Sequence, residues 1–327
     1  MINDNTVMTK TVGDNILQSA NKITPRRTKI LRTKRSIIPC AVSRRIHYVN
    51  DCFNRNMADY LTAFDNNAYL VLESKIFDLT SDDKSLLEFR MKTFHKFWSN
   101  FKPESSKESS NIRCLEFGGG PVVRNLISAS PKVDRIVFSE YLECNRRSVL
   151  SWLAGDTELL DWSPLIKYVV HDLEGDNNPE AISEREKDMK QKVQSVVSCD
   201  VNQNPIVDLE SIDVGKPFDV LSTSLCVEVV ASSEQQYKST MAKLCKFLKP
   251  NGYLIMFGVV NETFYTVGDA RFSHFGVTQR MIEEALKDAG IEDIKMELFH
   301  RAVKSTTADG QAFFSVVGKK SCMQMTV

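Results

Sequence analysis

The sequence predicts an α/β fold in which a mostly parallel sheet ends in an antiparallel strand and is preceded by a helical cap. Three observations predict it. From residue 112 onward, short apolar runs typical of strands alternate with helix-like segments, as in parallel sheets with crossover helices. The glycine cluster Gly118–Gly120 follows the first apolar run, where such a sheet turns from strand to helix. Residues 51–101 are helix-patterned and rich in aromatic side chains.

The elements follow in order along the chain. Strands are expected at 112–117, 135–140, 166–171, 196–201, 218–223 and 252–259. Helices are expected at 122–129, 143–154, 181–195, 233–248 and 278–289. Two extended runs, 293–301 and 311–318, predict a closing antiparallel pair. These runs number eight, one more than the seven strands of the mostly parallel sheet that we expect.

Charge divides the chain into unequal parts. Residues 1–45 hold ten Lys/Arg and two Asp, a net charge of +8, whereas the remainder carries −8. A solvated, disordered arm, a nucleic-acid or nuclear-import patch and a mitochondrial targeting sequence all fit this segment. We favour the disordered arm, because Asp4 and Asp14 are unusual in a transit peptide. The expected organisation is arm 1–45, helical cap 46–110 and catalytic domain 111–327, the last two forming one unit.

Composition limits the class of protein. No run approaches the ~18 apolar residues of a membrane helix, and the N-terminus lacks an apolar signal region. The eight cysteines are scattered and form no C-x-x-C pair, which favours reduced thiols over disulfides or zinc. We therefore expect a cytosolic monomer with no bound metal, no membrane contact and no nucleic-acid partner.

The segment Cys114–Pro121 carries the most chemical information. Gly118 and Gly120 allow a tight turn and a close approach of the backbone to a ligand. Glu140, at the end of the next predicted strand, can accept hydrogen bonds from ribose hydroxyls. A dinucleotide-binding site would have a third glycine where the chain has Val123. This disfavours a dehydrogenase, while Glu116, two residues before Gly118, suits the cationic end of S-adenosylmethionine.

Eight segments, this one included, appear in the order of a known family. They are Leu115–Pro121, Ser139–Arg146, Trp152-Leu153, Asp161–Pro164, Leu173–Gly175, Ser198–Val201, Leu248–Gly252 and Tyr265–Gly268. Together they resemble the small-amine N-methyltransferases, which include the nicotinamide, phenylethanolamine, indolethylamine and thioether methyltransferases. The resemblance runs from about Asp51 to Lys320. It implies the Rossmann-like class I methyltransferase fold and S-adenosylmethionine as methyl donor.

The resemblance also implies a set of cofactor contacts. Tyr60 matches the cap tyrosine that closes over the donor's carboxylate, and Glu140 stands where the family usually has aspartate. Three positions depart from the family: Phe64 and Asp65 replace cap tyrosines, and Arg124 replaces a tyrosine in the first helix. The full expected set of cofactor-binding residues is Tyr60, Gly118, Gly119, Gly120, Glu140, Asn145, Asp200 and Val201.

The acceptor side separates two substrate classes. A pyridine nitrogen is already nucleophilic, whereas an alkylamine with a pKa of about 10 must first lose a proton. Glu228 and Glu262 match the carboxylate pair that the phenylethanolamine enzyme places at its substrate amine, and we expect both to be catalytic. Tyr265 and Asp309 are expected to bind the substrate. The nicotinamide enzyme has an aspartate where this chain has Gly258.

We therefore expect an S-adenosylmethionine-dependent N-methyltransferase whose acceptor is a phenylethanolamine-type amine or nicotinamide. Two alternatives stay open at this point. The chain could be an inactive S-adenosylmethionine-binding regulatory or scaffold protein, because the cap tyrosines have changed. It could also methylate RNA or protein, with the basic arm as a tether.

Overall fold

The structure, a computed structural model, is described for most of the chain after residue 56. The described residues are 57–76, 84–103, 111–156, 160–207, 209, 217–301 and 305–322. The expected basic arm and the start of the expected cap lie outside these ranges.

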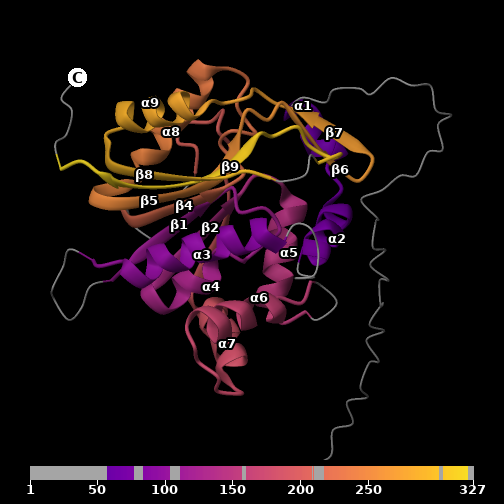
Figure 1. Cartoon of the computed structure of the whole chain (residues 1–327), viewed down its shortest axis with the longest axis vertical. Helices are drawn as coiled ribbons and strands as arrows, with labels where there is room; N and C mark the ends of the chain where they lie inside the picture. The colour runs from indigo at the N-terminus through magenta and orange to yellow at the C-terminus, as the bar shows by residue number, and fades with distance from the viewer. Residues whose placement is uncertain are drawn as a thin grey trace, which may run out of the picture. The chain divides into compact units, whose positions relative to one another are not determined.

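Seven strands form the central sheet (Figure 1). They are β1 (Arg113–Phe117), β2 (Arg135–Glu140), β3 (Val193–Ser198), β4 (Phe218–Ser224), β5 (Leu248–Val260), β8 (Ile291–Phe299) and β9 (Ala312–Lys320). Their order across the sheet is β3-β2-β1-β4-β5-β9-β8. The first five strands pair in parallel, and β9 pairs antiparallel with both β5 and β8. This arrangement confirms the predicted methyltransferase fold and its antiparallel closing strand.

Helices cover both faces of the sheet. They are α3 (Lys84–Asn100), α4 (Leu126–Ala129), α5 (Glu143–Leu153), α6 (Ser163–Lys167), α7 (Ala181–Lys192), α8 (Glu234–Cys245) and α9 (Gln279–Asp288). Figure 1 shows α3 and α4 on one face and α8 and α9 on the other. An apolar core lies on each face of the sheet, because successive side chains of a strand point to opposite faces. On β5, Phe257 packs into the first core and Met256 into the second.

Two of the helices begin at side-chain caps. The Ser233 hydroxyl accepts a hydrogen bond from the Gln236 N–H at 3.2 Å, and Thr278 does the same for Met281 at 3.2 Å. Such caps satisfy backbone donors that the first helical turn leaves unpaired. They place the starts of α8 and α9 close to the predicted boundaries.

The predicted strand at 166–171 is wrong. The chain there continues α6 and then forms a single π-helical segment over Tyr168–Leu173. Its apolar residues are buried, and a short buried run has the same sequence pattern in a helix as in a strand. Two helix-start signals favour the helix. Pro164 lies in its first turn, and the Asp161 carboxylate accepts a hydrogen bond from the Ser163 N–H at 2.9 Å.

Two predicted helices are shorter than expected. The helix expected at 122–129 is reduced to α4, because the chain from Gly120 to Asn125 stays in irregular turns. The helix expected at 181–195 ends at Lys192, where β3 begins. These shifts lengthen the loop beside the glycine cluster and leave the order of elements unchanged.

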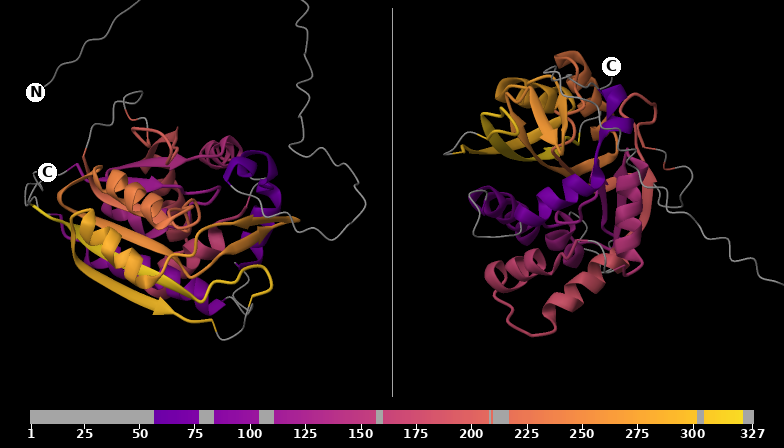
Figure 2. Two further views of the ribbon diagram at one scale, coloured as in Figure 1. Left: turned by 90° about the horizontal axis from the view of Figure 1, so that it is seen from above. Right: turned by 90° about the vertical axis from the view of Figure 1, so that its right-hand side faces the viewer.

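The cap meets a small hairpin at the carboxyl edge of the sheet. The cap contains α1 (Met57–Ala63), α2 (Asn66–Ile76) and α3, and the hairpin pairs β6 (Phe264–Val267) with β7 (Ala270–Ser273). Figure 2 shows α1 beside this hairpin. Phe64 from the cap packs with Val267 and Phe272 from the hairpin in a separate apolar cluster. The two elements therefore enclose the space above the strand ends.

Candidate active site

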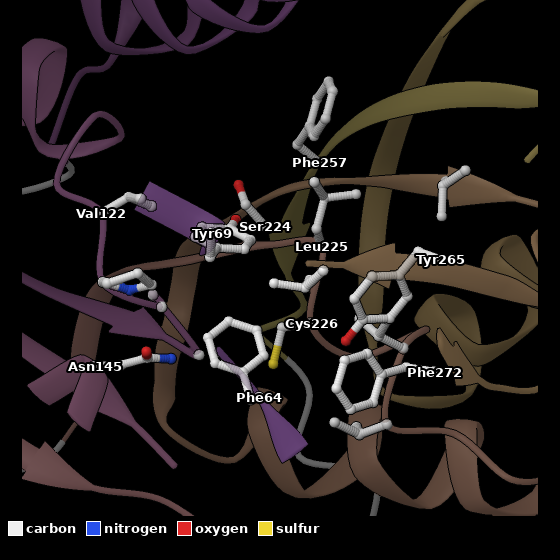
Figure 3. Close-up of a pocket in the computed structure, with 18 of the residues that line it drawn as sticks. Phe64, Tyr69, Val122, Asn145, Ser224, Leu225, Cys226, Phe257, Tyr265 and Phe272 are labelled. Carbon is white, nitrogen blue, oxygen red and sulfur yellow. The ribbon is translucent and has the colours of Figure 1, made fainter. Parts of the chain in front are cut away.

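A cavity of about 280 Å³ lies between the strand ends, the cap and the hairpin (Figure 3). Its wall includes Tyr60 from the cap, Gly118–Gly120 after β1, Asn145 from α5 and Tyr265 from the hairpin. Ligands of open α/β sheets bind in this position, outside the carboxyl ends of the strands. The fold therefore gathers most of the predicted site residues around one cavity.

The glycine loop is tied to the end of β2. The Gly119 N–H donates to the Ser139 carbonyl at 3.1 Å, and the Gly120 N–H donates to Glu140 Oε2 at 2.9 Å. Gly118 has a φ of +63°, and a Cβ there would collide with the Cys226 sulfur. A Cβ on Gly119 would collide with the Phe138 ring. Both positions therefore require glycine. Of the two glycines that the motif singles out, Gly118 and Gly120, the second also has a positive φ, of +65°.

Glu140 holds this corner of the site together. It is 5 % exposed, and its Oε1 accepts hydrogen bonds from the Leu142 N–H at 2.9 Å and from Asn145 Nδ2 at 3.0 Å. A carboxylate offers about four acceptor positions, and these two bonds with that from Gly120 use three. One position on Oε2 is left, so Glu140 can accept directly from one ribose hydroxyl without rearrangement.

Asn145 and Asp200 line the cavity together with Glu140. Asn145 is 1 % exposed, and its Oδ1 accepts from Asn66 Nδ2 of α2 at 2.8 Å, which links the cap to α5. Asp200 Oδ1 accepts from the Asn202 N–H at 2.9 Å. Val201 follows it and is buried in the wall. The predicted adenosine-binding residues are thus brought together at one end of the cavity.

Aromatic side chains close the top of the cavity. The Tyr60 ring lies 4.9 Å from Phe64 and 5.2 Å from Phe272, and Tyr265 stacks on Phe272 at 5.4 Å between ring centroids. Burial raises the pKa of Tyr60 and of Tyr265, so both phenols are neutral at physiological pH. Phe64 thus packs in the cluster where the family has a tyrosine, while the Asp65 carboxylate caps α2 at the Ala68 N–H.

Glu262 faces the cavity beside a histidine. It is 7 % exposed, and its Oε2 lies 3.2 Å from His274 Nε2. Asn261 has a φ of +53°, a left-handed conformation that asparagine tolerates, and it turns the chain immediately before Glu262. The Asn261 N–H donates to the Val277 carbonyl at 2.9 Å, which anchors the turn. Glu262 is therefore held on a fixed loop with its carboxylate at the wall.

Glu228 lies behind the cavity wall. It is fully buried, and its Oε1 accepts from the Val259 N–H at 3.2 Å. A Cβ on Gly258 would stand 2.5 Å from this oxygen. The Glu228 carboxyl therefore occupies the space next to Gly258, and of the two predicted glutamates it is Glu262 that lines the cavity.

Asp309 supports a loop and does not line the cavity. Its Oδ1 accepts from the Thr263 N–H at 2.7 Å and from the Phe264 N–H at 3.2 Å, and its Oδ2 accepts from the Thr263 hydroxyl at 2.6 Å. The carboxylate is exposed on the outer side of the hairpin. Its role in the site is to hold the segment that follows Glu262.

A comparison with protein-family models matches residues 52–321 to the NNMT/PNMT/TEMT family. The chain belongs to this family.

Three similar proteins match between 57 % and 74 % of the chain. Nicotinamide N-methyltransferase from Homo sapiens is 29 % identical over 260 residues, which cover 74 % of this chain and 96 % of that protein. Indolethylamine N-methyltransferase from Oryctolagus cuniculus is 25 % identical, covering 70 % and 91 %. Phenylethanolamine N-methyltransferase from Mus musculus is 28 % identical, covering 57 % and 61 %. As a member of this family, the chain is an S-adenosylmethionine-dependent N-methyltransferase.

The cavity suits this methyl donor. A Cβ at Gly118 or Gly119 would collide with Cys226 or Phe138, whereas Gly120 faces open space in the cavity wall. Glu140 keeps one acceptor position for a hydroxyl. No group of three or more metal-ligating side chains occurs among the residues that the structure describes. In the same part of the chain, no helix is both long and apolar enough to cross a membrane.

The sequence analysis did not identify three residues that lie in or beside the cavity of this family member. His274 contacts Glu262, which lines the cavity. Arg90 and Glu73, both in the cavity wall, were not identified. Arg90 had a signal: it falls between Leu87 and Phe94 on the buried face of α3, where a charged residue is unusual. Glu116, by contrast, is buried behind the wall, where Asn125 Nδ2 donates to its Oε1 at 2.6 Å.

Glu228 should make the stability of the protein depend on pH. Burial raises the pKa of this carboxyl from 4.5 to about 7, and the Glu262 charge adds to the rise. Because the folded-state pKa exceeds the unfolded one, this stabilisation is complete below about pH 4.5 and is lost as the pH rises through about 7. Relative to Glu228→Gln, we expect the wild-type unfolding free energy to fall by about 3 kcal/mol over this window.

Urea unfolding at a series of pH values measures the difference between the two proteins. Glu292→Gln, which changes an exposed glutamate, serves as the matched control. The expectation is contradicted if the difference in unfolding free energy between the wild type and Glu228→Gln stays constant between about pH 4 and about pH 8.

Proposed function

We propose that the chain methylates the nitrogen of a small aromatic amine or pyridine, with a phenylethanolamine-type amine as the preferred acceptor. The observation that carries this proposal is Glu262, a carboxylate in the cavity wall beside the aromatic side chain of Tyr265. The relatives named above, nicotinamide, indolethylamine and phenylethanolamine N-methyltransferases, support the same substrate class.

The cofactor contacts in this proposal follow the wall of the cavity. Gly118, Gly119 and Gly120 let the donor approach the backbone, and Glu140 and Asn145 bind the ribose. Asp200 and Val201 bind the adenine, and Tyr60 closes over the amino-acid end. All eight residues line the same cavity, which is what a single elongated ligand requires.

The main task of the protein in this reaction is to align the acceptor nitrogen with the methyl group of the donor. When bound, S-adenosylmethionine supplies a methyl group on a cationic sulfur. The acceptor nitrogen attacks the methyl carbon in line with the sulfur, which leaves with the bonding electrons. Tyr60, Tyr265 and Phe272 exclude water from the reacting atoms. Tyr265 also offers a ring face to an aromatic acceptor.

Glu262 binds the acceptor nitrogen through its N–H and takes the proton that an ammonium must lose before it can attack. His274, 3.2 Å from Oε2, holds this carboxylate in place. Glu228, behind the wall, adds a second titratable carboxyl without touching the acceptor. We keep Asp309 as the support of the Glu262 loop.

We also propose that the enzyme works as a monomer in the cytosol and needs no nucleic-acid partner. Among the described residues, Cys114, Cys199, Cys226, Cys245 and Cys322 are free thiols, which supports a reducing compartment.

Turnover of labelled S-adenosylmethionine with a phenylethanolamine-type amine and with nicotinamide, side by side, tests the proposal. We expect Glu262→Gln to lower kcat/KM for the amine about 100-fold, because a charge-assisted hydrogen bond and the proton acceptor are both lost. Glu292→Gln, an exposed glutamate, is the matched control. Full amine turnover by Glu262→Gln, or turnover of nicotinamide alone by the wild type, would contradict the preferred acceptor.

A further inference from the structure

A group of charged side chains lines the cavity where α2 and α3 meet the glycine loop. We call it the cap cluster: Tyr69 and Glu73 from α2, Arg90 from α3, and Arg124 from the turn after the glycine loop. Arg124 Nη1 forms an ion pair with Glu73 Oε2, and the two side chains are 2 % and 5 % exposed. The single negative charge in the cluster is therefore already engaged.

Arg90 is the uncompensated member of the cap cluster. It is 6 % exposed, its Nη2 donates to Asn125 Oδ1 at 3.2 Å, and its guanidinium lies 5.0 Å from the centre of the Phe257 ring. Its Nε has no hydrogen-bond partner, and no carboxylate of the described residues lies within ion-pair distance of it. Burying a cation in this way is costly unless an anion compensates it.

The two arginines also repel each other. Burial and, to a smaller extent, the positive charge of Arg124 lower the pKa of Arg90 to about 9, against the opposing effect of Glu73. Glu116 lies on the same side, but its Oε1 is occupied by Asn125 and burial raises the pKa of its carboxyl. An anionic group from a ligand would relieve the repulsion and compensate the buried cation.

The position of the cap cluster indicates which ligand group reaches it. Figure 3 shows Asn145 at one end of the cavity and Phe257, against which Arg90 packs, at another, with Tyr69 and Ser224 between them. Arg90 bonds to Asn125, and Asn125 donates to the Ser224 hydroxyl at 3.0 Å. A donor whose adenosine lies at Asn145 and Asp200 extends past the glycine loop towards these residues. Its amino-acid end carries the carboxylate.

We propose that Arg90 and Arg124 bind the α-carboxylate of S-adenosylmethionine, so that two guanidinium groups serve where the family uses tyrosine hydroxyls. This inference rests on the donor assignment made above. Guanidinium–carboxylate hydrogen bonds are charge-assisted and stronger than bonds from a neutral phenol. The changed cap tyrosines are therefore replaced by a stronger anchor for the donor.

Calorimetric binding of S-adenosylmethionine and of its decarboxylated analogue tests the proposal without any acceptor. In Arg90→Leu we expect the Kd of S-adenosylmethionine to rise about tenfold or more, while the Kd of the analogue changes by less than about twofold. Arg90→Lys should restore part of the difference. Arg185→Gln, which removes an arginine paired with Glu174 away from the cavity, is the control.

Thermal unfolding of the ligand-free protein separates this role from a structural one. Because Arg90 is an uncompensated buried cation, Arg90→Leu should raise the Tm of the free protein by about 2 °C or more and reduce the rise in Tm that S-adenosylmethionine causes. Equal weakening of both ligands, or an unchanged preference for the carboxylated one, would overturn the proposal. If the wild type bound neither ligand, the donor assignment itself would fall.

Discussion

Glu140→Ala is expected to abolish donor binding and to lower the unfolding free energy by about 3–5 kcal/mol. The Glu140 carboxylate accepts from the Gly120 and Leu142 N–H groups and from Asn145. Alanine would leave these buried donors without partners, at roughly 1–3 kcal/mol each, and would release the glycine loop from β2. Loss of the remaining acceptor position should raise the Kd of S-adenosylhomocysteine more than about 100-fold.

Isothermal calorimetry and urea unfolding measure the two effects of Glu140→Ala. Glu140→Gln keeps one acceptor oxygen and should give an intermediate loss in both. The matched control is Glu143→Ala, since Glu143 is paired with Arg147 on the exposed face of α5 and should contribute less than about 1 kcal/mol. A Glu140→Ala protein that binds S-adenosylhomocysteine within about tenfold of the wild type would show that the glycine loop positions the donor without this carboxylate.

Gly258→Asp, which installs the residue of the nicotinamide enzyme, is expected to destabilise the fold by about 3 kcal/mol or more. A Cβ at this position would stand 2.5 Å from Glu228 Oε1 and 2.5 Å from the Phe314 ring, and both side chains are fully buried. Overpacking a core costs about 1–3 kcal/mol. A second carboxylate beside Glu228 adds repulsion in a medium of low dielectric.

A double-mutant cycle identifies the cause. Glu228→Ala should remove the clash with the carboxyl and leave the one with Phe314. Gly258→Asp combined with Glu228→Ala should therefore be destabilised by less than the sum of the two single changes. Urea unfolding of the four proteins measures the coupling energy. Additive effects, or a Gly258→Asp protein with the stability of the wild type, would show that the space beside Gly258 is not limited by Glu228. The substitution alone would then be a route to a nicotinamide-type pocket.

The accuracy of the sequence-based predictions differed by element. The parallel strands and the closing antiparallel pair lie close to the positions predicted from the alternation of strand-like and helix-like segments. The strands were recognisable because a strand buried on both faces needs a continuous apolar run. The segment 166–171 was predicted wrongly for the same reason, since a buried helix can satisfy an identical run. At the site, the glycine loop, Glu140 and Asn145 were anticipated because their chemistry is local to the turn between two strands.

Residues that act through distant partners were not anticipated in the same way. Glu228 and Glu262 look alike in the sequence, yet one is fully buried behind the wall and the other faces the cavity. Asp309 has the residue type of a ligand-binding acid, but its carboxylate accepts hydrogen bonds from Thr263 and Phe264. Which oxygen faces a ligand depends on packing between segments far apart in the chain.

The sequence by itself determined the family fold, the methyl donor and the corner where the donor's ribose is expected to bind. The methyl donor follows from the resemblance to the family. The fold and the ribose corner depend on short-range features: apolar periodicity, glycines at fixed spacing and an acid at a strand end. Only the tertiary structure decided that Arg90 lacks a partner carboxylate, that His274 supports Glu262 and that Glu228 fills the space beside Gly258. The reason is physical, because burial and pairing set the energy of a charge, and both arise from contacts between remote segments.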